Sequence, residues 1–146
     1  MRGVSPDILN HLAKGVTYTE KFVKDGAEKS TSLKKPKYGN KKCEWDGIIF
    51  DSKKELARYQ ELVYMERAKV IKHLCRQIPF VLIPKGTKHR ETVYILDHYF
   101  VDEKGVEVYE DVKGFDKKTG KFRTTADFEI KKKLMFSVHK INITLK

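Results

Sequence analysis

Residues 92–113 read TVYILDHYFVDEKGVEVYEDVK, and this stretch determines the fold that the rest of the chain must complete. β-Branched and aromatic residues dominate two runs, 92–101 and 106–112, as they do in β-strands. Four turn-forming residues ending in Gly105 separate the runs, and glycine readily adopts the positive φ that a tight turn needs. We therefore predict an antiparallel β-hairpin.

The length of the turn decides which residues face each other across this hairpin. A three-residue loop at 103–105 places Asp102 opposite Val106, and the same register carries Asp97 directly opposite Asp111. A loop one residue longer or shorter would still leave the two aspartates close neighbours. Because side chains alternate along a strand, Asp97 is expected to share its face with four residues: Val93, Ile95, Tyr99 and Val101.

Two opposed carboxylates among apolar neighbours form the candidate active site. Like charges at directly opposed positions cost up to about 1 kcal/mol when solvated, and more when buried. A divalent cation would offset this repulsion, because Mg²⁺ binds one or two carboxylates and keeps several waters. Lys113 lies two residues after Asp111 on the same face, where it can hold a nucleophilic water and oppose charge developing on a phosphate.

The acid-x-lysine spacing alone carries little information in a chain with 35% charged residues. The same spacing occurs at four other places: Asp51–Lys53, Asp102–Lys104, Asp116–Lys118 and Glu129–Lys131. Only Asp111–Lys113 combines it with a predicted strand and a second acid on the partner strand. The alternative interpretation is a solvated salt bridge on an edge strand.

The segment before the hairpin predicts one more hairpin, a helix and a strand. Asp46-Gly47 between apolar flanks favours a type I′ turn. Ser52-x-x-Glu55 has the spacing of a capping box, and a helix over 53–68 follows it. A strand is expected over 77–83, where a proline indicates an edge position or a strand start.

The segment after the hairpin predicts a polar loop over 116–123, a helix over about 125–138 and a short strand over 141–145. The full order is then helix, three strands, helix and strand. This order predicts the α/β class, with helices packed on a small mixed sheet. We assign residues 43–146 to one domain.

Residues 1–42 are expected to form an appended arm. Ser5-Pro6 suits the start of a short helix ending near Ala13, and a polar, lysine-containing stretch follows it. We expect this arm to be flexible and basic. It either lies along DNA or is a terminus without a role.

Charge points to a nucleic-acid partner. The 146 residues include 31 Lys+Arg and 20 Asp+Glu, which gives a formal net charge of +11 and a pI near 9.6. Such a protein attracts polyanions, because each neutralised phosphate releases condensed counterions. No glycine-rich phosphate loop is present, so no nucleotide cofactor is expected, and no HxH or HxxxH pair indicates zinc chemistry.

Hydropathy predicts a cytoplasmic protein. The mean hydropathy is -0.57, no apolar run approaches the length of a membrane span, and the N-terminus lacks the apolar stretch of a signal peptide. We therefore expect no membrane partner. Cys43 and Cys75 lie outside any CxxC pattern, so both are expected to be reduced and structural.

Four short stretches resemble the PD-(D/E)xK nuclease superfamily, most closely its small phage-encoded endonucleases and Holliday-junction-resolvase-like proteins. They are WDGIIFDSKKE (45–55), QIPF (77–80), YILD (94–97) and EDVKGF (110–115). The resemblance covers about residues 38–146. It implies a restriction-endonuclease-like αβββαβ core with an extra N-terminal hairpin, Mg²⁺ or Mn²⁺ as cofactor, DNA as substrate and, for a phage protein, the bacterial cytoplasm.

The resemblance also implies roles for individual residues. Asp97 resembles the aspartate of the PD motif and Asp111 the second metal ligand. Lys113 resembles the catalytic lysine, and Glu55 the metal-binding acid that many members carry on the first helix. Leu96 stands where the motif nominally has proline, which is a common deviation.

Three of the candidate residues have simpler explanations that stay open. Glu55 has a sufficient structural role if it closes the capping box on Ser52. Gln77 is similar to a glutamine that lines the site in some members, but it also fits a surface polar residue before a strand. His98 falls on the opposite face from Asp97 and is expected to pack or to contact DNA.

Basic residues near the end of the chain are candidates for contacts with DNA phosphates. They are Lys117, Lys118, Lys121 and Arg123 in the polar loop, and Lys131, Lys132 and Lys133 on the predicted helix. The alternative is an ordinary solvated helix face.

The leading hypothesis is therefore a Mg²⁺-dependent endodeoxyribonuclease. Within that class, family analogy favours a resolvase of branched DNA, which would act as a homodimer because it cuts two strands symmetrically. A non-catalytic nucleic-acid-binding module on a nuclease-like fold is the main alternative. An RNA-binding accessory protein would fit the charge but would leave the opposed acids unexplained.

Overall fold

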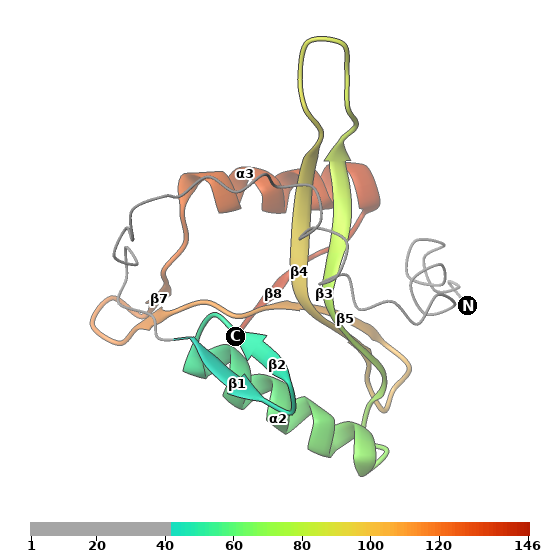
Figure 1. The fold of residues 1–146 in the computed structure, drawn as a ribbon, viewed down its shortest axis with the longest axis vertical. Helices are drawn as coiled ribbons and strands as arrows, with labels where there is room; N and C mark the ends of the chain where they lie inside the picture. Colours follow the sequence, from blue (N-terminus) through green and yellow to red (C-terminus); the bar gives the residue numbers. More distant parts are fainter. Residues whose placement is uncertain (1–41) are drawn as a thin grey trace.

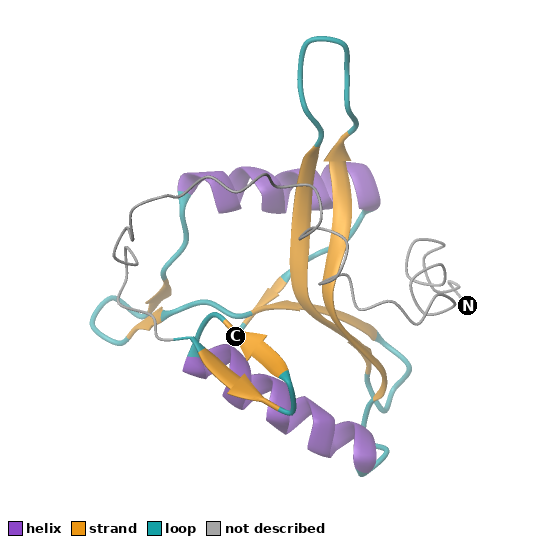
Figure 2. Ribbon diagram, in the orientation of Figure 1, coloured by secondary structure: helices purple, strands orange, loops and turns teal. Residues whose placement is uncertain are grey.

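The computed structural model describes residues 42–146, and a four-stranded mixed sheet forms its centre (Figures 1 and 2). The strands lie in the order β3 (Lys72–Ile83), β4 (Thr92–Val101), β5 (Glu107–Asp111) and β8 (Thr144–Leu145). The first three pair antiparallel, and β8 pairs parallel to β5. This small mixed sheet, with its two helices, fits the predicted α/β class.

Helix α2 (Lys53–Arg67) precedes the sheet and agrees with the helix predicted over 53–68. Its fully buried side chain, Leu62, packs with Ile71 and Phe100 in a small apolar cluster. Phe100 belongs to β4, so α2 covers one face of the sheet at the end where the strands β4 and β5 are joined.

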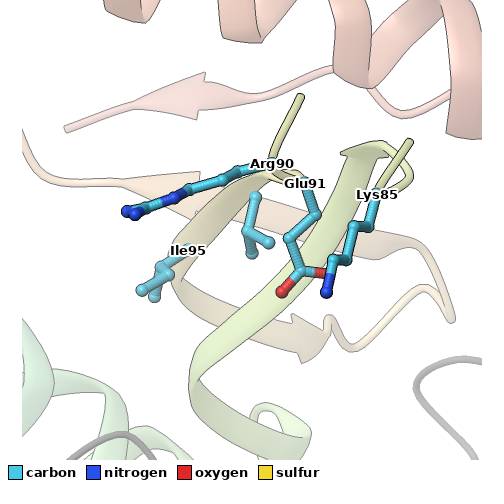
Figure 3. A pocket seen from close by; sticks show the side chains of 5 residues that line it. Lys85, Arg90, Glu91 and Ile95 are labelled. Carbon is cyan, nitrogen blue, oxygen red and sulfur yellow. The ribbon is translucent and has the colours of Figure 1, made fainter. Parts of the chain in front are cut away.

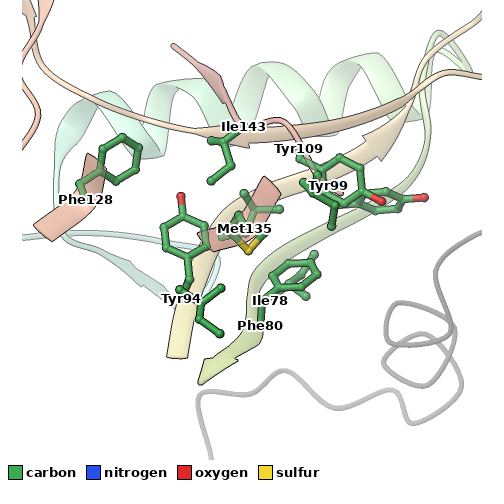
Figure 4. Packing of buried hydrophobic residues seen from close by; sticks show 11 residues of the cluster. Ile78, Phe80, Tyr94, Tyr99, Tyr109, Phe128, Met135 and Ile143 are labelled. Atoms are coloured by element: carbon green, nitrogen blue, oxygen red, sulfur yellow. The ribbon is translucent and has the colours of Figure 1, made fainter. Parts of the chain in front are cut away.

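Helix α3 (Ala126–Leu134) and the π-helical turn that continues it, η2 (Met135–His139), pack into the main core. The predicted helix over 125–138 is present, with a changed hydrogen-bonding pattern in its last turn. Phe128 and Met135 contribute to this core (Figure 4). Their partners come mainly from the strands: Ile78, Phe80, Leu82, Tyr94, Leu96, Tyr99 and Tyr109.

The N-terminal hairpin consists of β1 (Cys43–Trp45) and β2 (Ile48–Phe50). Its two turn residues both have positive φ, 53° at Asp46 and 73° at Gly47, as a type I′ turn requires. The predicted turn is therefore confirmed.

Strand β3 begins at Lys72, before the predicted start at Gln77. The first part of the strand contains several polar residues, so it does not form the apolar run from which a strand is predicted. Two residues within it, His73 and Gln77, have positive φ of 58° and 52°, and the pairing with β4 is irregular near Lys72. The strand is the outermost one of its sheet, so Pro79 lies in the expected edge position.

The alternation of side chains along β3 and β4 changes phase at Gln77. Tyr99 and Leu96 on β4 are both fully buried in the main core, although they lie three positions apart and regular alternation would place them on opposite faces. Ile95 is 48% exposed. The prediction that Ile95 and Tyr99 share one face was therefore wrong, because the positive φ of Gln77 breaks the regular pleat opposite Asp97.

The polar loop predicted over 116–123 contains an additional small hairpin, β6 (Phe115–Asp116) and β7 (Lys121–Phe122). The last strand, expected over 141–145, is shortened to β8. Each strand of this hairpin has only two residues, which is too short to show the alternation of apolar and polar side chains, so the sequence did not predict it.

The short helix and arm expected within residues 1–41 lie outside the described residues. Between Lys42 and Lys146, no helix has both the length and the apolar character needed to cross a membrane.

Candidate functional site

The candidate site lies where two pairs of strands diverge. The arm formed by β3 and β4 rises away from β5 and β8 (Figure 1). Regular pairing of β4 with β5 ends at His98 and Glu110. The next residue of β4 in this direction is Asp97, and its Oδ2 accepts a hydrogen bond of 2.8 Å from the backbone N–H of Val112. A carboxylate thus occupies the place where the backbone ladder stops.

The register of the hairpin agrees with its prediction. The backbone N–H of Asp102 donates to the carbonyl of Val106 at 2.9 Å, and the pairing continues through His98 and Glu110. Extended by one residue, this register sets Asp97 opposite Asp111. The register follows from the three-residue loop over 103–105, in which Gly105 has a φ of 77°.

Asp97 is held by two hydrogen bonds but remains electrostatically unfavourable. Besides the bond from Val112, its Oδ1 accepts one of 3.3 Å from Gln77 Nε2. Burial and then the charge of Asp111 raise the pKa of Asp97 to about 6, against the opposing effect of the Val112 hydrogen bond. Gln77 therefore contacts the first aspartate of the candidate site.

Asp111 is 2% exposed, and its two oxygens have different surroundings. The hydroxyl of Tyr94 donates a short hydrogen bond of 2.5 Å to Oδ1. Lys113 Nζ lies 2.5 Å from Oδ2, which is inaccessible to solvent. The contact is therefore an ion pair that compensates one negative charge of the site. Burial and Asp111 both raise the pKa of Tyr94.

Lys113 is fixed by contacts from three other elements. Its backbone N–H donates to the Lys146 carbonyl at 2.8 Å, beside β8, and its carbonyl accepts a hydrogen bond from Lys54 of α2. Its ammonium lies 4.5 Å from the centroid of the Phe128 ring on α3, a distance typical of a cation–π contact. The side chain keeps 27% exposure, so it can reach a substrate.

Glu55 lies at the start of α2 and serves its helix cap. Its backbone N–H donates to Ser52 Oγ at 3.2 Å, and the Ser52 hydroxyl lies within 3.3 Å of Glu55 Oε1 as a donor. Burial and Asp51 raise the pKa of Glu55, while Lys113 lowers it. Glu55 also contributes to the raised pKa of Asp97. Ser52 therefore caps α2, and the Glu55 carboxylate contacts this cap residue and lies within electrostatic range of the site.

Two acids of the candidate site, Asp97 and Asp111, could together bind a hard divalent cation. Among residues 42–146, no three His, Cys, Asp or Glu side chains gather with the geometry of a metal site. Mg²⁺ needs only one or two protein carboxylates, because waters and substrate phosphate complete its octahedron. Asp97 and Asp111 supply two such carboxylates. Glu55 lies outside this pair.

The predicted DNA-contacting residues fall on two separate elements. The small hairpin that begins two residues after Lys113 carries four exposed ones: Lys117, Lys118, Lys121 and Arg123. Helix α3 carries the other three, of which Lys133 is exposed while Lys131 and Lys132 are half-buried. Lys131 forms an ion pair of 3.3 Å with Asp127 on its own helix. The first group thus follows the site directly in the chain.

Sequence reasoning missed Tyr94 and Arg76. Arg76 lies with its guanidinium 4.9 Å from the ring centroid of Phe50 and 5.6 Å from that of Tyr59. Burial lowers its pKa, against the opposing charges of Glu55 and Asp97. It therefore adds positive charge near the acids without forming a direct salt bridge. No local signal identifies it, because its importance comes from the packing of β3 against α2 and β2.

His98 and Glu110 form a separate buried network on the α2 side of the sheet. Glu110 accepts two hydrogen bonds from Arg58, at 2.8 and 2.7 Å. His98 is 3% exposed, lies with Nδ1 3.7 Å from Glu110 Oε1, and stacks on Tyr59. Of the two roles expected for His98, the structure favours packing.

The arm formed by β3 and β4 carries a shallow, open hollow (Figure 3). Its lining residues are Lys85, Arg90, Glu91, Val93 and Ile95. A single acid and two basic side chains offer no opposed carboxylates there. The opposed carboxylates lie instead where β4 and β5 diverge.

Comparison with known proteins assigns a family but no activity. Residues 35–146, more than half of the chain, match the model of a family described as a protein of unknown function (DUF1064), and the chain belongs to this family. No curated protein and no solved structure matches it.

Proposed function

We propose that this protein is a Mg²⁺-dependent endodeoxyribonuclease, which Mn²⁺ would also support. The observation that carries the proposal is the buried pair Asp97 and Asp111 with Lys113 Nζ 2.5 Å from Asp111 Oδ2. Two acids and a lysine in this arrangement suit metal-assisted hydrolysis of a phosphodiester.

Electrostatics supports a metal at the pair. Burial and then the charge of Asp111 disfavour ionisation of Asp97, and both effects raise the pKa of Asp97. Lys113 supplies one positive charge against two negative ones. A bound Mg²⁺ would neutralise the remainder and would supply an activated water together with charge stabilisation at the phosphate.

The protein holds both carboxylates in fixed directions. Val112 N–H and Gln77 orient Asp97, and the Tyr94 hydroxyl orients Asp111. Such preorganisation lowers the reorganisation needed during the reaction. Lys113 is partly exposed, so its ammonium can oppose negative charge that develops on the phosphate.

DNA as the substrate is supported by charge. The formal net charge is +11, and four exposed basic side chains follow Lys113 within ten residues. These charges give affinity for phosphates without sequence preference. Branched DNA is the specific substrate that the superfamily resemblance implies. A resolvase would act as a homodimer, so a monomer at micromolar concentration by light scattering would count against that narrower proposal.

Cleavage of DNA tests the proposal directly. Plasmid, flap and four-way-junction DNA would be incubated with Mg²⁺ or Mn²⁺ and the wild-type protein, Asp111→Asn or Glu103→Gln. Glu103 is an exposed acid in the turn between β4 and β5, so its variant controls for the change in charge. We expect cleavage by wild type and Glu103→Gln only. Equal activity of wild type and Asp111→Asn would refute the assignment.

Calorimetric titration with Mg²⁺ separates the enzyme from a non-catalytic DNA-binding module. We expect binding that is lost in Asp97→Asn and in Asp111→Asn. A protein that binds DNA but shows no Mg²⁺ binding dependent on these two residues would instead be the non-catalytic module.

A further inference from the structure

The small hairpin β6–β7 combines aromatic and basic side chains directly beside the proposed site. Phe115, two residues after Lys113, is 48% exposed. It contacts Phe122 across the hairpin, with ring centroids 5.2 Å apart and planes at 68°. An exposed phenylalanine is unfavourable in water, and nothing in the apolar cores uses this ring.

Hydrogen bonds fix the position of this hairpin. Arg123 N–H donates to the Gly114 carbonyl at 2.7 Å, which closes the hairpin at its base. Near the tip, Gly120 N–H donates to the Asp116 carbonyl at 2.8 Å, and Lys118 N–H donates to Asp116 Oδ1 at 2.9 Å. Phe115 therefore has a defined position relative to Lys113.

The two aromatic rings are not equally available to a ligand. Phe122 is half-buried, and Lys54 Nζ lies 5.7 Å from its ring centroid while the same ammonium donates to the Lys113 carbonyl. Phe115 has no such cation over its ring among the described contacts. Its free surface is consequently the one that a partner can cover.

The hairpin surrounds this ring with positive charge. Its exposed basic side chains are Lys117, Lys118, Lys121 and Arg123. The one acid on the hairpin, Asp116, is engaged by the Lys118 backbone. A polyanion that also offers flat apolar surfaces complements this combination, and single-stranded nucleic acid has both properties.

We propose that hairpin β6–β7 binds an unpaired nucleotide of the DNA beside the phosphate that is cleaved, with Phe115 stacked on the base and the basic side chains on the backbone. This inference rests on the proposed nuclease function and narrows its substrate. Inside B-DNA the base faces are covered by their neighbours, so a stacking side chain favours flaps, gaps and branch points. Preference for such DNA would then come from this hairpin.

Fluorescence anisotropy with three labelled DNAs of related sequence tests the inference. A blunt duplex, a single strand and a four-way junction with unpaired nucleotides would be bound at one salt concentration in the Asp111→Asn background, which is not expected to cleave. Phe115→Leu keeps an apolar side chain for the hairpin but removes the aromatic face. We expect it to weaken binding of the single strand and the junction about tenfold, and of the duplex less than twofold.

Two further variants serve as controls. Phe136 on η2 is 53% exposed, comparable to Phe115, and lies at the opposite end of α3, so Phe136→Leu is expected to change no affinity. Phe115→Tyr keeps the stacking surface and is expected to bind like the parent. An unchanged affinity of Phe115→Leu, or an equal loss on all three DNAs, would overturn the inference.

The binding assay is independent of hydrolysis. Absence of Asp111-dependent cleavage would refute the nuclease proposal and leave the anisotropy result intact. Cleavage that depends on Asp111 but shows no role for Phe115 in single-strand binding would refute this inference alone.

Discussion

Glu110 and Asp111 are adjacent in the sequence, and both are buried, but their surroundings are opposite. Glu110 is 0% exposed and faces α2, where two hydrogen bonds from Arg58 hold it. These bonds lower its pKa to about 2, despite its burial. Glu110 is thus a carboxylate whose charge the fold satisfies.

Asp111 is 2% exposed and faces the side of α3, where a second acid opposes it. One lysine, Lys113, lies beside two acids, and the pKa of Asp97 is raised to about 6. Burying a charge without full pairing is unfavourable. Under the proposed function, Glu110 stabilises the fold and Asp111 takes part in the chemistry, because Arg58 compensates the charge of Glu110 while a second acid lies opposite Asp111.

Asp111→Asn should have the largest effect of these variants, and this effect should be on DNA cleavage and not on stability. We expect DNA cleavage to fall at least about 1,000-fold, which corresponds to about 4 kcal/mol of transition-state stabilisation. The free energy of unfolding should stay equal or rise, because one of two repelling charges is removed. Single-turnover cleavage and urea denaturation measure the two quantities. A large loss of stability in this variant would place Asp111 with Glu110 as a structural residue.

Glu110→Gln should have the reverse effect. Removing one partner of a buried ion pair leaves the Arg58 charge uncompensated and lowers the free energy of unfolding by about 3–5 kcal/mol. The pKa of Glu110 lies below its unfolded value, so this stabilisation is present above the ordinary pKa of 4.5 and is lost as pH falls toward 2. Urea denaturation at pH 3 and 7 measures it. A stability gap that does not shrink at the lower pH would contradict the mechanism.

Asp97→Asn should stabilise the protein in a pH-dependent way. The folded pKa, about 6, lies above the ordinary value of 3.8, so the folded state binds the proton more tightly. Wild-type stability therefore falls as pH rises through this window, and the penalty is complete above pH 6. We expect the asparagine variant to be more stable by about 3 kcal/mol at pH 8.

The gain from Asp97→Asn should disappear at pH 4, where the aspartate is protonated in the fold. Thermal unfolding of both proteins across this range measures the difference. A constant difference at all pH values would mean that neither burial nor the charge of Asp111 raises the pKa of Asp97 in the folded protein.

Glu55→Gln and Ser52→Ala should separate the two roles of the first turn of α2. Ser52→Ala removes the N-cap and should lower the free energy of unfolding by about 1 kcal/mol without changing cleavage by the folded protein. Glu55→Gln keeps an amide that can serve the cap. If the carboxylate takes part in the reaction, as we expect, cleavage falls about tenfold at unchanged stability, which is about 1.4 kcal/mol. Unchanged cleavage would leave Glu55 as a capping residue only.

The local parts of the fold followed from the sequence. Asp46-Gly47 set its turn, Ser52 capped its helix, and the loop ending at Gly105 fixed a register that carries Asp97 toward Asp111. In each case a few neighbouring residues decide the geometry, through φ, a cap hydrogen bond or the two-residue period. The candidate pair of acids is therefore visible in the sequence.

The tertiary structure decided the surroundings of that pair. The phase change at Gln77, the pairing of Arg58 with Glu110, the hydroxyl of Tyr94 on Asp111 and the position of Arg76 join residues far apart in the chain. No period or motif encodes such contacts, because they form only when helices and strands pack. The sequence by itself determined that two acids and a lysine meet at this hairpin. Packing determined that Glu110 is paired with Arg58, while Asp111 shares a single lysine with a second acid.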